Sequence, residues 1–277
     1  MALAVESPMH RPKLTRGVSA IIAMALLAIF STSGPLSAQW TKVPQAAGPR
    51  TADGKPNLSA PAPRLPDGKP DLSGTWEPSD NRYVGNIAAG IDPEAVPFQS
   101  WAKAAFESRR DGSHAREDPP ASCLPQGVPR LIAAPAPWKV VQTPKFVVIL
   151  YEAFNLWRQV FLDGRELMPD ANPTWLGYST GKWEGDTLVV ETRGFNGKAW
   201  LDQLGRPTTD ALHVTERFTR IDFGHLQVRV TIDDPKAYSR PWTVTEDARL
   251  LPDTEPMEFI CNENNRDIEH LPGKSTQ

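Results

Sequence analysis

The sequence predicts a mainly β protein, an antiparallel up-and-down β-barrel with one N-terminal helix packed outside it. From Trp138 onward, about eight segments are rich in β-branched and aromatic residues, and short turns separate them. One of them, Leu226–Ile232, alternates strictly between apolar and polar side chains, as a strand with one buried face does. A meander of this size protects its edges best by closing into a barrel, although a two-sheet sandwich is the competing architecture.

The first 38 residues have the three parts of a secretory signal peptide. Arg11, Lys13 and Arg16 form a basic region, Val18–Phe30 is a short apolar run, and small residues lead to an expected cut after Ala38. The apolar run is shorter than the roughly 20 residues of a membrane span, so no stable span is expected after cleavage. The sequence therefore predicts a periplasmic or secreted protein; the alternative is an uncleaved N-terminal anchor.

Residues 39–65 are rich in Pro, Ala, Gly and Lys, which predicts a Pro-rich linker that is poorly ordered or lies across the surface. The linker contains the stretch DGKPNLS at Asp53, which returns as DGKPDLS at Asp67. Two copies this short do not make a repeat fold. A single barrel domain is expected over residues 66–277.

One clear helix is predicted, over Asp92–Arg110. Phe98, Trp101 and Ala105 fall on one helical face, and Gly112 ends the segment. The strand-like stretch Phe146–Ala153 is apolar on both faces. We expect the apolar face of the helix to cover the outer side of this strand.

The charge and the cysteines limit the possible partners and cofactors. The chain has 30 basic and 33 acidic residues, a balance that gives no electrostatic footprint for nucleic acid and no polybasic membrane patch. Cys123 and Cys261 both follow the signal, and two thiols in an oxidising compartment usually pair, so a disulfide is expected; the alternative is two separate buried thiols. Neither cysteine has a second Cys or a His at ligand spacing, so no metal site is predicted. No phosphate loop or dinucleotide fingerprint is present, so no cofactor is predicted.

Two resemblances follow from motifs in the chain. The stretch LSGTW at Leu72–Trp76, placed ahead of a β meander, resembles the calycin superfamily, which includes the lipocalins. In that superfamily the Trp closes the barrel floor, so Gly74 and Trp76 would take these places here. The stretches DGKPDLSGTW and PTWLGYSTGKWEGDTLVVET are similar to an uncharacterised family of secreted bacterial proteins. This second resemblance implies secretion and a single domain, and it supplies no catalytic residues.

The hairpin-like stretch Pro173–Phe195 supplies candidate ligand-binding residues. Trp175, Tyr178 and Trp183 are predicted to line the mouth of a pocket, where amphipathic rings suit mixed ligands. The alternative is that these rings only pack the hairpin. Our first functional hypothesis is a protein that binds an apolar or amphipathic small molecule inside the barrel.

The segment around Glu216 places an acid on an apolar strand face. Leu212, Val214 and Phe218 define this face, and Glu216 and Arg220 share it by strand alternation. A buried acid is costly unless it is paired, so a ligand cavity that holds Glu216 with an Arg is one hypothesis. A purely structural ion pair, or a strand end where the Arg reaches water, is the alternative.

The second functional hypothesis is a cofactor-free lyase, isomerase or hydrolase on the same barrel. Its candidate acid–base residues are Glu216, Asp234, Tyr238 and His213, although His213 points to the other strand face and Asp234 is also compatible with a simple turn. On this hypothesis Glu216→Gln abolishes turnover and leaves the melting temperature near that of the wild type. The fold does not choose between binding and catalysis.

Overall fold

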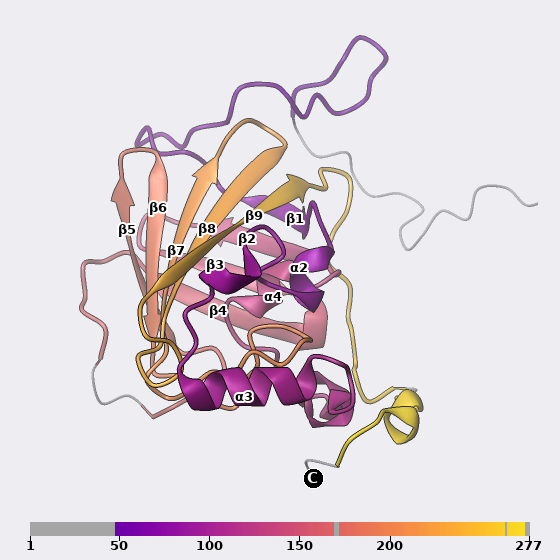
Figure 1. Cartoon of the computed structure of the whole chain (residues 1–277). Helices are drawn as coiled ribbons and strands as arrows, with labels where there is room; N and C mark the ends of the chain where they lie inside the picture. Colours follow the sequence, from indigo (N-terminus) through magenta and orange to yellow (C-terminus); the bar gives the residue numbers. More distant parts are fainter. Residues whose placement is uncertain (1–47, 169–171, 264, 275–277) are drawn as a thin grey trace, which may run out of the picture. The chain divides into compact units, whose positions relative to one another are not determined.

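Nine strands close into one barrel in the order of the sequence (Figure 1). The computed structural model describes residues 48–168, 172–263 and 265–274, so the expected signal peptide lies outside the described residues. The strands are β1 (Gly74–Pro78), β2 (Trp138–Gln142), β3 (Phe146–Tyr151), β4 (Leu156–Phe161), β5 (Tyr178–Glu184), β6 (Thr187–Arg193), β7 (His213–Arg220), β8 (His225–Asp233) and β9 (Trp242–Leu250). The α-helices are α2 (Arg82–Gly85), α3 (Ser100–Arg109) and α4 (Arg130–Ala133), and the 3-10 turns are Pro93–Ala95, Ala115–Glu117, Pro119–Ser122, Ala153–Asn155 and Asp267–His270. The closed barrel is consistent with a calycin-like fold.

One strand pair is parallel, and it lets an odd number of strands close. In a barrel with only antiparallel neighbours the strand direction alternates, so nine strands would leave β1 and β9 parallel. The parallel pair β4–β5 supplies the single exception, and β1 and β9 then pair antiparallel. The prediction of a purely antiparallel barrel is therefore wrong at β4–β5. This pair has only two registered positions, Val160 with Ser179 and Phe161 with Thr180.

The end of the barrel beside the β7–β8 turn is closed by apolar packing. Trp76 is fully buried there, and its indole nitrogen donates to the carbonyl of Leu72 at 3.0 Å. The Arg220 guanidinium lies 5.0 Å from the Trp76 ring and donates to the carbonyls of Asp71 and Phe223. The apolar cavity beneath measures only ≈ 10 Å³, about the space of one water molecule.

The repeated N-terminal stretch lies across this same barrel end. An Arg three residues before each copy donates to the Gly carbonyl within it, from Arg50 to Gly54 at 2.9 Å and from Arg64 to Gly68 at 2.8 Å. The carbonyl of Leu58 then accepts from the backbone N–H of Gly224 at 2.7 Å, in the turn between β7 and β8. Among the described residues, 48–65 are thus held against the barrel by backbone hydrogen bonds.

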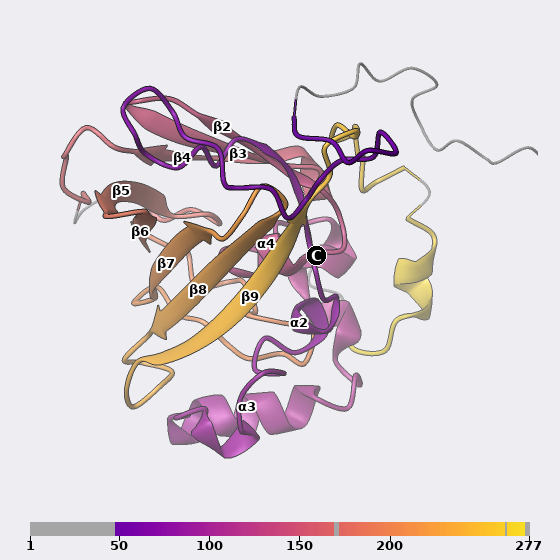
Figure 2. The ribbon, with the colours of Figure 1, turned by 90° about the horizontal axis from the view of Figure 1, so that it is seen from above.

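The helix α3 packs elsewhere than the sequence predicts. It begins at Ser100, after a separate 3-10 turn over Pro93–Ala95, and it buries Ala102 and Phe106 while Trp101 is 49% exposed. Figures 1 and 2 place α3 beside the connection between β8 and β9, where the Trp101 indole donates to the carbonyl of Lys236 at 2.7 Å. The outer side of β3 stays open, with Leu150 39% exposed. The expectation that the helix covers this strand is wrong, because α3 packs on the loops at the far end of the barrel.

Cys123 and Cys261 form the predicted disulfide, with their sulfurs 2.10 Å apart and their Cα atoms 5.5 Å apart. The bond joins the segment before α4 to the tail after β9, and the two cysteines are 138 residues apart in sequence. The loop that it closes contains strands β2 to β9. The disulfide therefore restricts nearly the whole barrel sequence in the unfolded chain.

Replacing both cysteines by serine is expected to lower the free energy of unfolding by about 2 kcal/mol, the low end of the usual disulfide range, because Cys261 lies in a tail rather than a strand. The melting temperature should fall by about 4–8 °C in thermal unfolding followed by circular dichroism. Reductant should lower the melting temperature of the wild type and leave that of the double variant unchanged. Equal melting temperatures for both proteins would show that the bond does not stabilise the barrel.

Candidate functional site

The barrel wall opens where β4 and β5 part. Beyond their two registered positions the strands share no further pairing, and a cleft of ≈ 460 Å³ lies between them. We call it the β4–β5 cleft; it is lined by Pro125, Leu156, Trp157, Arg158, Gln159, Phe161, Thr174, Trp175, Leu176, Gly177, Tyr178 and Ser179. The lining is mostly apolar and aromatic, with a few polar groups, which is the usual composition of a small-molecule site.

The chain that leads into β5 is held in place by local geometry. Thr174 accepts from Asn196 and donates to the carbonyl of Gly194, both through the backbone at 2.9 Å. Gly177 has a φ of +65°, and a Cβ there would lie 2.7 Å from the carbonyl oxygen of Arg193, so only glycine fits. These contacts fix Trp175 and Tyr178 on one wall of the cleft.

The opposite wall and the floor come from β4. Trp157 points outward and is 63% exposed, whereas its neighbour Arg158 points into the barrel and is buried. Consecutive side chains of a strand face opposite sides, so the same strand supplies an aromatic rim residue and a charged floor residue. The β4–β5 cleft thus combines exposed rings at its mouth with a guanidinium at its base.

Arg158 extends across β5 and β6 to reach Glu216 on β7. Its Nε donates to the Ser179 hydroxyl at 3.0 Å, Nη1 donates to Glu216 Oε1 at 3.2 Å, and Nη2 donates to Glu216 Oε2 and to the Thr192 hydroxyl. Burial alone would lower the pKa of Arg158, but the attraction of Glu216 outweighs it and the net shift of the pKa is upward. The two side chains therefore form a buried, two-pronged ion pair.

A second acid, Glu246, is buried in the barrel, and no ion pair joins it to a cation within the part of the chain that the structure describes. Its Oε1 is buried and has no hydrogen-bond partner among the described residues. Burial, and then repulsion by Glu216, raise the pKa of Glu246 to about 8. The Glu246 carboxyl is therefore mainly protonated at neutral pH. Burial also raises the pKa of Tyr151, to about 12, and the neighbouring Arg158 guanidinium opposes that rise.

The predicted ligand-binding residues are divided by the structure. Trp175 and Tyr178 both line the β4–β5 cleft. Trp183 does not line the cleft. It lies near the end of β5, next to the turn into β6, with the Lys69 ammonium 5.9 Å from its ring. Arg220 shares the inward face with Glu216, but it closes the barrel end beside Trp76, and the partner of Glu216 is Arg158.

The predicted acid–base residues are not brought together. His213 lies on the outer strand face and accepts from Arg193 at 3.1 Å; burial and then Arg193 lower the pKa of its imidazole. Asp234 accepts from the backbone and the hydroxyl of Thr209, at 2.7 and 2.6 Å. The Tyr238 hydroxyl donates to the carbonyl of Pro207 at 3.0 Å. Only Glu216 faces the barrel interior behind the cleft.

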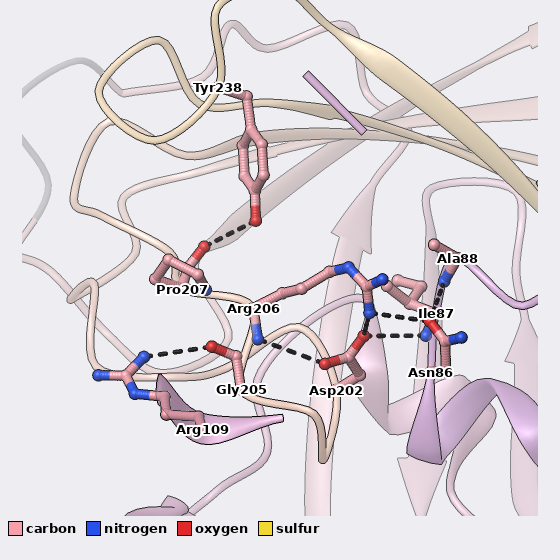
Figure 3. A network of polar contacts seen from close by, with 9 residues as sticks. All are labelled: Asn86, Ile87, Ala88, Arg109, Asp202, Gly205, Arg206, Pro207 and Tyr238. Atoms are coloured by element: carbon pink, nitrogen blue, oxygen red, sulfur yellow. Dashed lines mark hydrogen bonds and ion pairs between the residues drawn. The ribbon is translucent and has the colours of Figure 1, made fainter. Parts of the chain in front are cut away.

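Near Tyr238, a polar network ties together the loops at the far end of the barrel (Figure 3). Buried Asp202 accepts from Arg206 and from the backbone N–H of Ile87 at 3.0 Å, and Arg206 also donates to Asn86 at 2.8 Å. Burial raises the pKa of the Asp202 carboxyl, and the attraction of Arg206 opposes that rise. Because each charge is paired and the remaining contacts reach loop backbone, we assign this network a structural role.

Sequence reasoning did not single out Arg158, Trp157, Tyr151 or Glu246. The inward direction of Arg158 and of Glu246 could have been predicted from strand alternation. Arg158 lies between inward-facing Leu156 and Val160, and Glu246 lies between Val244 and Ala248 in the same way. A charged residue in the apolar phase of a strand is the pattern that pointed to Glu216. The opening of the wall beside Arg158 has no comparable signal in the sequence.

No family model, curated protein or solved structure matches this chain. Within residues 48–168, 172–263 and 265–274, no three His, Cys, Asp or Glu side chains gather in an arrangement that could hold a metal ion. In the same part of the chain no helix has the length and apolar character needed to cross a bilayer.

Proposed function

We propose that the protein binds a small amphipathic molecule in the β4–β5 cleft. The observation that carries the proposal is the opening of the barrel wall between β4 and β5, with Trp157, Trp175 and Tyr178 around it and Arg158 at its base. Its volume of ≈ 460 Å³ lies within the usual range for small-molecule sites. The apolar cavity inside the barrel, at ≈ 10 Å³, is too small for such a guest, so the cleft rather than the apolar half of the lumen is the proposed site.

The rings supply the apolar part of recognition. Aromatic side chains bury large areas at a small cost in side-chain entropy, and their flat faces suit ring systems and alkyl chains alike. The polar groups of Arg158 and Ser179 at the base then orient the molecule. A ligand with one apolar and one polar end fits this arrangement.

A cofactor-free acid–base enzyme is the second candidate, and the Glu216–Glu246 pair favours it. Glu246 holds a proton near neutral pH, whereas Glu216 is ion-paired with Arg158. Two carboxyls in different protonation states are a common basis for general acid–base catalysis. On this reading Glu246 would be the acid, and a bound molecule would be converted with time to a product that chromatography separates from it, in the presence of the wild type but not of Glu246→Gln.

We further propose that the protein works in the periplasm or outside the cell. The disulfide between Cys123 and Cys261 supports this location, because such bonds persist mainly in oxidising compartments. The signal-like N-terminus and the resemblance to secreted bacterial proteins support it as well. The near balance of charges gives no reason to propose a nucleic-acid partner.

Binding can be tested with N-phenyl-1-naphthylamine, an uncharged probe whose fluorescence rises in apolar surroundings. The wild type should bind it with a saturable rise in emission. Trp175→Ala should weaken binding about fivefold or more, because truncating an aromatic hot-spot residue costs over about 1 kcal/mol. The matched control is Trp101→Ala, which removes a half-exposed Trp on α3 and should leave the affinity unchanged. Absence of saturable binding by the wild type, or equal affinities for both variants, would contradict the proposal.

A further inference from the structure

Three buried polar groups of the barrel interior have an unused donor or acceptor in the part of the chain that the structure describes. The indole Nε1 of Trp138 and Oε1 of Glu246 have no partner, and the Tyr151 hydroxyl, which lies beside the Arg158 guanidinium, has no acceptor for its proton; each of these residues is less than 5% exposed. A buried polar atom left unpaired lowers the stability of a folded protein by about 1–3 kcal/mol, so three of them together would destabilise this barrel considerably. Buried polar groups in proteins are nearly always paired, and an ordered water or another bound molecule can supply a missing bond.

These groups belong to one region of the barrel. Trp138 and Tyr151 are directly opposite each other in the pairing of β2 with β3, and both face inward. The charges of Arg158 and Glu216 both act on the Tyr151 hydroxyl, and Glu216 also acts on Glu246. We call the inward-facing set Trp138, Tyr151, Arg158, Glu216 and Glu246 the polar chamber.

The polar chamber adjoins the β4–β5 cleft. Arg158 and Ser179 line the base of the cleft, and the same two side chains contact Thr192 and Glu216 within the barrel. Arg158 therefore belongs both to the cleft and to the chamber. A molecule held in the cleft by its apolar part can direct its other end past Arg158 into the chamber.

The charges of the chamber select against a charged end. An anionic group would approach the Glu216 carboxylate, while the one guanidinium of the chamber is already engaged by Glu216 through both Nη atoms. A cationic group would approach Arg158, and it could not accept hydrogen bonds from the Trp138 N–H or the Tyr151 O–H. An uncharged oxygen can accept from these two donors without burying a charge.

We propose that the ligand's polar end is an uncharged, oxygen-bearing group such as a hydroxyl, which enters the polar chamber and accepts from the Tyr151 O–H and Trp138 N–H. This inference rests on the proposed binding function and specifies its ligand class. A hydroxyl also has a proton, which it can donate to a carboxyl oxygen such as Oε1 of Glu246.

The test uses three competitors with the same alkyl chain: 1-octanol, octanoate and octylamine. Each displaces N-phenyl-1-naphthylamine from the wild type at pH 7, where octanoate is anionic and octylamine is cationic. We expect 1-octanol to compete at least tenfold better than either charged compound. If the probe does not bind, the proposed function fails; if it binds but the three compete equally, or a charged compound competes best, the inference on the polar end is overturned and the binding function stands.

Two tyrosine variants separate recognition from stability. Tyr151→Phe removes only the hydroxyl and should weaken 1-octanol about 3- to 10-fold, with octanoate and octylamine changed by less than twofold. The matched control is Tyr238→Phe, which removes a buried hydroxyl that already donates to Pro207. This control should leave all three competitors unchanged. Unchanged competition by 1-octanol with folded Tyr151→Phe protein would mean that the chamber is filled by water alone and would overturn the inference.

Discussion

Glu216→Ala is expected to lower the free energy of unfolding by about 3–5 kcal/mol, because it leaves the buried Arg158 guanidinium without its counter-charge. For a domain of this size the melting temperature should fall by about 10 °C in circular dichroism or calorimetry. Glu216→Gln should destabilise in the same direction by a smaller amount, since an amide keeps an acceptor but not the charge. The expectation that this variant keeps the wild-type melting temperature is therefore revised.

The control and the double variant identify the cause. Glu191 lies on the outer face of β6, half exposed, so Glu191→Gln should change stability by less than about 0.5 kcal/mol. Replacing the pair together, as Arg158→Met with Glu216→Leu, should recover much of the loss, since apolar side chains of similar size remove both buried charges. A double variant as unstable as Glu216→Ala would show that the pair is not the source of the effect.

Glu246→Gln is expected to stabilise the protein at neutral pH. The pKa of Glu246 is about 8 in the folded state against 4.5 for an unperturbed Glu. Between these values the folded protein keeps a proton that the unfolded chain has released, so the stability of the wild type falls as the pH rises through this range. Glutamine does not titrate, and the variant avoids this loss. By pH 7 the advantage should reach up to about 3 kcal/mol.

Urea unfolding at several pH values measures this effect. The difference in stability between Glu246→Gln and the wild type should grow from about pH 4.5 to pH 8 and then level off. The matched control is Asp247→Asn, the outward-facing neighbour on β9, which should differ from the wild type by less than about 0.5 kcal/mol throughout. A difference that does not vary with pH would mean that Glu246 is not held protonated by its surroundings.

The sequence predicted the barrel because strand alternation is a local property. In β7 and β8 nearly every second side chain is buried, as the patterns around Val214 and Val228 indicate. The parallel pair β4–β5 was not predictable in the same way. It depends on where β5 begins relative to β4, and the sequence between the two strands carries no strand pattern that would show it.

The candidate site was predictable only in part, for a related reason. Trp175 and Tyr178 were predicted to line a pocket because they are aromatic residues at the start of a hairpin, and both line the cleft. The inward direction of Glu216 followed from alternation, but its partner did not, because Arg158 lies 58 residues away and reaches it across two strands. Which inward-facing charges meet in a barrel depends on register and strand order, and a single strand's sequence contains neither.

The most direct test of the account is a nuclear magnetic resonance titration of the ¹⁵N-labelled protein with 1-octanol, observed at the indole N–H signals of its nine tryptophans. We predict saturable shifts for Trp157 and Trp175 at the cleft and for Trp138 in the chamber, and none for Trp101 on α3. Shifts confined to other tryptophans, or no saturable shift at all, would contradict a binding site between β4 and β5.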